Sequence, residues 1–198
     1  RLKSKATVIF ALLCVFTLFS LPKLLYSNSM HPKLFDWAAA CLFTFMIGFD
    51  EEIQSRHLQL GILAKLGIYF GVVLSSVIFG LSHFTNYLYG HQPLGQTLEQ
   101  MVSATGFGVL AAGLYLITGR LIVPIIFHAI TDLPMALSRN LEGGSGDAAP
   151  GSDWGFTLVL LGIYLLVGFT LVYLAKQNSN GDLIKSYKGS DFSEPLYA

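Results

Sequence analysis

The chain has 198 residues, of which 53% are hydrophobic and 12% charged, and its mean hydropathy is +0.59. A soluble domain carries about 25% charged residues, so this composition indicates a membrane protein. Twelve basic residues balance twelve acidic ones, which excludes the basic surface that nucleic-acid binding needs and the charge excess typical of disorder. Cys14 and Cys41 both lie in apolar runs, so we expect neither a disulfide framework nor a cysteine metal site.

Six apolar stretches reach or approach the length of about 20 residues that a transmembrane helix needs. In chain order they are 6–22, 37–49, 66–82, 100–119, 121–138 and 154–175. The second stretch has only thirteen residues, so we expect its helix to continue through the acidic residues that follow. The sequence therefore predicts an all-α, polytopic membrane protein with about six transmembrane helices and a site inside the helix bundle.

Two details of the third and fourth stretches refine this prediction. A third span that began at Leu66 would put His83 about 26 Å along it, near the face opposite to Glu51. We therefore expect this span to enter later, with residues 58–69 partly interfacial and the helix running on through Tyr87, which also gives both spans adequate length. The alternative is a second helix that begins deeper in the membrane. Gly106, Gly108 and Gly113 lie in the fourth stretch, where small residues permit neighbouring helices to approach closely. We therefore expect close helix packing there rather than a phosphate-binding loop.

The linkers and the charge distribution predict one domain and its orientation. We expect a single transmembrane helical domain over residues 1–176, a mobile loop at 143–152 and a polar, disordered cytoplasmic tail at 177–198. With six spans, nine of the twelve Lys and Arg residues fall on the side that holds the N-terminus. The positive-inside rule therefore places both termini of this integral, multi-pass membrane protein in the cytoplasm.

The first group of charged residues is Asp50-Glu51-Glu52, followed by Arg56. Ionisable side chains within a span are costly, so each is a functional candidate. Glu52 and Arg56 are four residues apart with the acid first, which lets them pair on one face of a helix. Glu51 points about 100° away from Glu52, and its carboxylate suits a general base that acts on water. The alternative is a solvated pair of glutamates at the cytoplasmic end of the helix.

Two further pairs have i,i+4 spacing, Phe79 with His83 and His128 with Asp132. His83 lies where an apolar run stops, so an ordinary interfacial histidine is the alternative there. His128 and Asp132 lie near the middle of a span, where Asp132 could ligate an ion with His128 or fix the tautomer of its imidazole. Imidazoles and carboxylates match the ligands of zinc, so the residues predict a divalent-metal site of His83, His128 and Asp132. Together with Glu51, this constellation is typical of a water-activating hydrolase.

Three short motifs follow one another in separate apolar segments: Glu51-Glu52-x-x-x-Arg56, Phe79-x-x-x-His83 and His128-x-x-x-Asp132. In this order they resemble the motifs of the CAAX protease and bacteriocin-processing (CPBP) family of intramembrane endopeptidases, which includes the type II CAAX prenyl endopeptidases. The resemblance covers residues 37–137. It implies hydrolysis of a peptide bond in a membrane-associated peptide or protein, such as a prenylated CAAX C-terminus, a leader peptide or a bacteriocin-related substrate.

The resemblance also implies a role for each residue of the first motif and for both histidines. Glu51 activates the attacking water, and Glu52 and Arg56 support the helix. His83 and His128 either bind a metal ion, with zinc expected, or stabilise the oxyanion directly in a metal-independent enzyme.

The resemblance also bears on Phe79 of the second motif, on Asp132 of the third and on the residue after Arg56. Phe79 is expected beside the substrate or the catalytic side chains. Many members of the family have Asn at the position of Asp132, so a ligand or orienting role is favoured here over that of an oxyanion-stabilising amide. Gly often follows the motif arginine in the family, whereas this chain has His57.

Two functions of other classes remain open from the sequence. In a proton-coupled transporter the same carboxylates and histidines would form a relay, and such proteins favour inverted repeats and interrupted helices, which the sequence does not display. A non-catalytic bacteriocin-immunity or scaffold protein would keep the same shape to bind a toxin or a partner helix.

Overall fold

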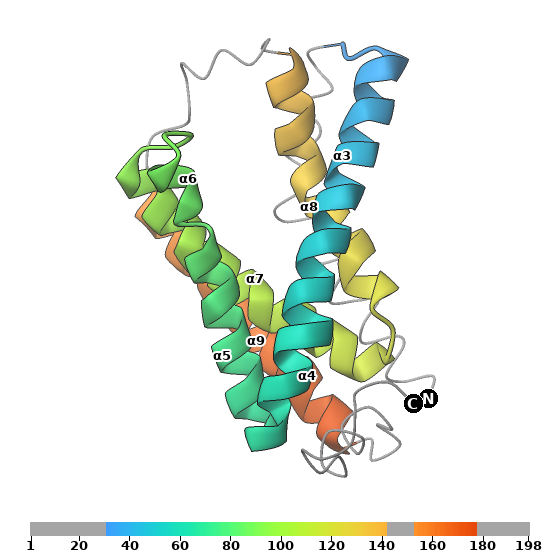
Figure 1. Ribbon diagram of the computed structural model, residues 1–198, viewed down its shortest axis with the longest axis vertical. Coiled ribbons are helices and arrows are strands. Elements are labelled where there is room, and N and C mark those ends of the chain that lie inside the picture. The colour runs from blue at the N-terminus through green and yellow to red at the C-terminus, as the bar shows by residue number, and fades with distance from the viewer. Residues whose placement is uncertain (1–30, 142–152, 178–198) are drawn as a thin grey trace. The chain divides into compact units, whose positions relative to one another are not determined.

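A computed structural model describes residues 31–141 and 153–177 (Figure 1). Within these ranges every regular element is helical and no strand occurs, which confirms the predicted all-α class. The first predicted span at 6–22, the loop at 143–152 and the tail from 178 onward lie outside the described residues.

Long helices match five of the six predicted stretches. They are α3 Leu34–Glu52, α5 Ile68–Ser82, α7 Leu94–Thr118, α8 Ile122–Leu141 and α9 Trp154–Gln177. Shorter elements connect α3, α5 and α7, namely the π-helical segment η2 Ile53–Gln59, α4 Leu60–Leu63, the 3-10 turn η3 Ala64–Leu66 and α6 Thr85–Leu88. The helix of the second stretch thus continues through the acidic residues, as predicted.

The ends of these helices follow from local hydrogen bonding and backbone geometry. At the start of α3 the Lys33 amide donates to Asp36 Oδ2 at 2.8 Å, and at the start of α9 the Phe156 amide donates to Asp153 Oδ1 at 3.0 Å. Such carboxylates satisfy amides that have no partner within the helix. At the end of α7 Gly119 adopts φ +66°, a left-handed conformation that glycine accepts without steric cost.

The described residues form two compact units. The α3/α8 unit contains residues 31–53 and 121–141, and the α5/α7/α9 unit contains residues 54–120 and 153–177. Helix α3 lies antiparallel to α8 in the first unit (Figure 1), because Ala40 near its start clusters with Ala136 while Gly48 near its end approaches Ile125.

Glycines set the helix spacing in the α5/α7/α9 unit, which confirms the predicted close packing. A methyl group on Gly108 would lie 2.8 Å from the Ser76 side chain of α5. Two other glycines of α7 face α9. A methyl group on Gly106 would meet Leu161 of α9 at 2.9 Å, and one on Gly113 would meet the Gly168 carbonyl oxygen of α9 at 2.6 Å. Since these last two contacts follow the same order along both helices, α7 and α9 run in the same direction.

Three helical segments of the described chain are long and apolar enough to cross a membrane. They are Ile68–Leu88, Leu94–Thr118 and Trp154–Gln177, with a shorter apolar stretch at Ile122–Leu137. The first segment includes Tyr87, as predicted, but α5 itself ends at Ser82 and a turn at residues 83 and 84 leads into α6. Where this segment enters the bilayer stays a prediction. The count of six spans is not reached, and α3 falls outside the set because it carries four acidic residues, Asp36, Asp50, Glu51 and Glu52.

Candidate functional site

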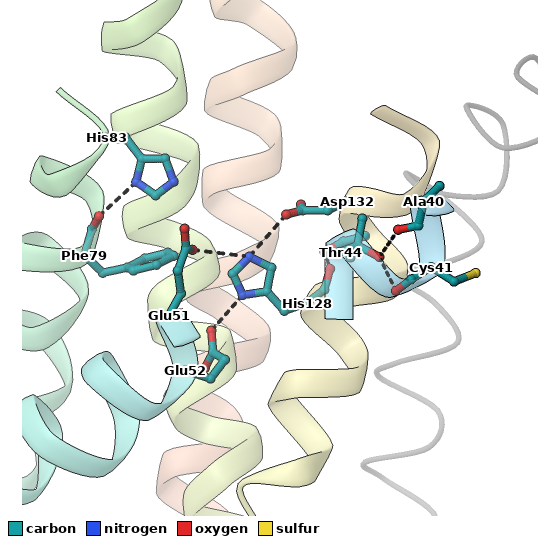
Figure 2. Close-up of polar contacts among 10 residues, drawn as sticks. Ala40, Cys41, Thr44, Glu51, Glu52, Phe79, His83, His128 and Asp132 are labelled. Carbon is teal, nitrogen blue, oxygen red and sulfur yellow. Dashed lines mark hydrogen bonds and ion pairs between the residues drawn. The ribbon is translucent and has the colours of Figure 1, made fainter. Parts of the chain in front are cut away.

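His128 is the centre of a polar cluster in the α3/α8 unit. Its ring is buried on α8, and its Nδ1 atom lies 3.0 Å from Glu52 Oε1, a hydrogen bond in which the ring nitrogen donates to the carboxylate. The other ring nitrogen, Nε2, lies 3.4 Å from Asp132 Oδ2 and 3.6 Å from Glu51 Oε2. Figure 2 shows the three carboxylates converging on the imidazole. Four residues from two of the predicted motifs therefore meet at one ring.

The two neighbouring glutamates differ in their access to solvent. The Glu52 side chain is completely buried, whereas the Glu51 side chain is 33% exposed. Successive residues of a helix point about 100° apart, so the two carboxylates reach opposite nitrogens of the same ring. Glu52 is therefore suited to holding the imidazole, and Glu51 to meeting water or a substrate.

The local sequences of α3 and α8 explain how these side chains come together. On α8, Asp132 follows His128 by four residues, which places both on one face. On α3, the buried residues are spaced by four: Ala40, Thr44, Gly48 and Glu52. We call this row the α3 seam. Its small members permit α8 to lie close, and its last member provides the carboxylate that meets His128.

A second cluster, formed by Arg56, Phe79 and His83, lies within the α5/α7/α9 unit. The buried Phe79 ring has the Arg56 guanidinium carbon 5.0 Å from its centroid. The His83 ring lies 5.1 Å from the same centroid in an edge-on arrangement. The Phe79 ring thus contacts Arg56 of the first motif and His83 of the second motif, to which Phe79 itself belongs.

The backbone of Phe79 also fixes the protonation pattern of a neutral His83. His83 Nδ1 lies 3.0 Å from the Phe79 carbonyl oxygen (Figure 2). A carbonyl only accepts, so the proton of the ring resides on Nδ1. Nε2 of the neutral ring then carries the lone pair, which suits an acceptor or a ligand role.

The predicted site residues thus fall into two groups. Glu51, Glu52, His128 and Asp132 meet in one unit, and Arg56, Phe79 and His83 meet in the other. The predicted pairing of Glu52 with Arg56 and the joint ligand set of His83, His128 and Asp132 stay predictions.

Sequence reasoning missed the contact between Glu52 and His128, since it assigned Glu52 only to the support of its helix. The signal that could have found it is the four-residue spacing of the α3 seam. A row of small residues that ends in Glu52 indicates a helix face packed against a close neighbour.

Among the residues that the structure describes, no group of three or more His, Cys, Asp or Glu side chains is placed to hold a metal ion. Around His128 Nε2, Asp132 Oδ2 lies at 3.4 Å and Glu51 Oε2 at 3.6 Å.

Comparison with known proteins adds one finding. Residues 32–134 match a family model described as type II CAAX prenyl endopeptidase Rce1-like. The match covers more than half of the chain and includes every motif residue from Glu51 to Asp132. No curated protein and no solved structure matches the chain.

Proposed function

Because the chain belongs to the type II CAAX prenyl endopeptidase Rce1-like family, we propose that it is an intramembrane endopeptidase that hydrolyses a peptide bond of a membrane-associated substrate. The observation that carries the proposal is the convergence of Glu51, Glu52 and Asp132 on the His128 ring. An imidazole next to the carboxylate of a partly exposed glutamate provides the general base and the hydrogen-bond donor that peptide hydrolysis requires.

Glu51 is the proposed general base. The Glu51 side chain is one-third exposed, although its Oε2 atom is buried next to His128. Its carboxylate removes a proton from water, and the water oxygen forms a bond to the carbonyl carbon of the substrate. The carbonyl oxygen becomes an oxyanion, which His128 stabilises. The family motifs imply the same role for His83, which requires a proton on both of its ring nitrogens because Nδ1–H is bound to the Phe79 carbonyl oxygen. The tetrahedral intermediate collapses with cleavage of the C–N bond, and Glu51 returns its proton to the leaving amine.

Glu52 and Asp132 are proposed to hold the His128 ring for this chemistry. The hydrogen bond to Glu52 fixes the Nδ1 side of the ring, so Nε2 faces Glu51 and Asp132. A carboxylate that accepts from one nitrogen of an imidazole determines the direction of the other.

A second version of the proposed mechanism is metal-dependent, with zinc held by His83, His128 and Asp132. When bound, such an ion would polarise the substrate carbonyl and the attacking water. Elemental analysis of purified protein, with and without prior chelation, measures whether zinc accompanies activity.

The proposed substrate class is a prenylated CAAX C-terminus, in keeping with the description of the family. Leader peptides and bacteriocin-related peptides are the alternatives that a substrate panel would include. All of them present a peptide bond at the membrane, which a protein with several apolar helices can reach laterally.

The proposed topology has α3 and α8 in the bilayer as well. Because α7 and α9 run in the same direction, the chain between Thr118 and Trp154 has to return across the membrane, and α8 is the described helix of that segment. Helix α3 lies antiparallel to α8, which supports a further crossing. With the predicted first span this gives six helices and both termini in the cytoplasm.

Glu51→Gln tests the proposed function. The protein is reconstituted in liposomes with an internally quenched, farnesylated CAAX peptide, and cleavage is followed by fluorescence and mass spectrometry. We expect Glu51→Gln to remain folded and to lose at least about 100-fold in kcat, because a neutral amide cannot accept the proton. Asp50→Asn, a change at the exposed carboxylate next to it, is the matched control. Retained cleavage by Glu51→Gln would overturn the mechanism.

A further inference from the structure

The α3 seam brings α3 and α8 together along most of their length. At one end Ala40 is fully buried in a cluster with Ala136 and Leu137 of α8. Toward the other end Gly48 is buried next to Ile125 and His128. The seam is therefore closely packed in the turn that precedes the carboxylates of the site.

Gly48 has no room for a side chain. A methyl group there would lie 3.0 Å from the Ile125 carbonyl oxygen, 3.3 Å from His128 Cβ and 3.4 Å from the Ala129 amide nitrogen. Two of these neighbours are backbone atoms, which cannot move aside by rotating a side chain. Any larger residue at position 48 must therefore shift α8 itself by a few tenths of an ångström.

His128 contacts the α3 seam at two successive turns of the α3 helix. Its Cβ faces Gly48, and its Nδ1 donates to Glu52, one helical turn further along α3. A displacement of α8 at Gly48 therefore acts directly on the length of the hydrogen bond between His128 and Glu52, and through the ring on the separation of Nε2 from Glu51.

We infer that Gly48 is a positioning residue, which sets the spacing of α3 and α8 at which Glu52 holds the His128 ring. The inference rests on the proposed function, since it assigns Gly48 to the same site. The inference also predicts a change in the hydrogen bond between His128 Nδ1 and Glu52, which can be measured whether or not the protein cleaves a peptide.

The kinetic test compares Gly48→Ala with two matched variants. We expect Gly48→Ala to lower kcat for the farnesylated CAAX peptide at least about tenfold with KM changed less than about twofold, because a small misplacement of a catalytic group acts on the transition state. Ala40→Val overpacks the far end of the same seam and Gly162→Ala adds a methyl group where nothing lies within 4 Å, and both should keep kcat.

The spectroscopic test uses protein labelled with ¹⁵N-histidine in nanodiscs. The His128 Nδ1 resonance is assigned from its loss in His128→Gln. We expect Gly48→Ala to shift this resonance in the same direction as Glu52→Gln, whereas Ala40→Val leaves it in place. Glu52→Asp, which withdraws the carboxylate by one methylene and leaves the seam intact, should reproduce both the shift and the fall in kcat even if Gly48→Ala does not fold.

Each outcome is decisive. An unchanged resonance and kcat in Gly48→Ala, or in Glu52→Asp, would overturn the inference. Equal losses of kcat in Gly48→Ala and Ala40→Val would also overturn it, since the effect would then be general destabilisation. Failure of the wild-type protein to cleave any peptide of the panel would refute the proposed function alone, because the His128 resonance would still report the role of Gly48.

Discussion

Glu52 on α3 and His128 on α8 are 76 residues apart in the chain, yet Glu52 Oε1 lies 3.0 Å from His128 Nδ1. Both side chains are buried, so water does not compete for this hydrogen bond. The contact ties together the two helices that carry Glu51 and Asp132, and it makes Glu52 a structural as well as a chemical element of the site.

Glu52→Ala should destabilise the protein. The variant leaves the buried Nδ1 donor of His128 without its acceptor, and we expect the free energy of unfolding to fall by about 1–3 kcal/mol. Glu52→Gln keeps an acceptor oxygen and should lose less. Unfolding by SDS in mixed micelles measures the difference, with the exposed Asp50→Ala as the control. A wild-type unfolding curve for Glu52→Ala would contradict the importance of the contact.

Phe79→Leu should impair catalysis more than folding. The leucine fills much of the same volume but removes the ring that contacts both Arg56 and His83. An aromatic contact of this kind contributes about 0.5–1.5 kcal/mol, and we expect kcat to fall about tenfold. Phe70→Leu changes an exposed phenylalanine of the same helix and should be neutral. Equal kinetics for the two variants would show that the Phe79 ring does not position His83.

Gly113→Ala should loosen the contact between α7 and α9. The added methyl group would meet the Gly168 carbonyl oxygen, and overpacking of this kind costs about 1–3 kcal/mol. Gly162→Ala adds the same group to α9 where nothing lies within 4 Å, so it should be neutral or slightly stabilising. Thermal unfolding followed by circular dichroism compares them, and equal midpoints would argue against close packing at Gly113.

The two ends of α7 should lie on opposite sides of the membrane. On the proposed topology His91, before α7, faces outward and Arg120, after it, faces the cytoplasm. In a variant whose Cys14 and Cys41 are replaced by serine, His91→Cys should react with an impermeant maleimide on intact cells, and Arg120→Cys only after lysis. The reverse pattern would invert the proposed orientation of every helix.

The apolar stretches predicted the long helices because a membrane helix is encoded locally, by a run of residues that lipid accepts. The start of α7 was predicted too late for the same reason, since Gln96 and Glu99 lower the hydropathy of a segment that still forms a helix. Helix α3 was expected to continue through Glu51 and Glu52 because thirteen apolar residues cannot cross a bilayer, and this argument from length proved correct.

The candidate site could be predicted only as a set of residues. Spacing along one helix suggested the pairing of His128 with Asp132, which the structure contains. Spacing also suggested Arg56 as the neighbour of Glu52, since an i,i+4 rule detects partners on the same helix alone. The contact between Glu52 and His128 depends on how α3 meets α8. The spacing of the α3 seam marks the packed face of α3, but it does not identify α8 as the helix that covers this face.

The long separation of Glu52 from His128 has a consequence for synthesis of the protein. On the proposed topology, α3 enters the bilayer while α8 is still untranslated. The chain grows at about 5–20 residues per second, so the 76 residues that separate the two partners take roughly 4–15 s to make. During that interval the acidic end of α3 depends on the insertion machinery or on the lipid headgroups for solvation. We therefore expect a nascent chain arrested between α3 and α8 to be degraded by membrane quality-control proteases faster than one that already contains α8.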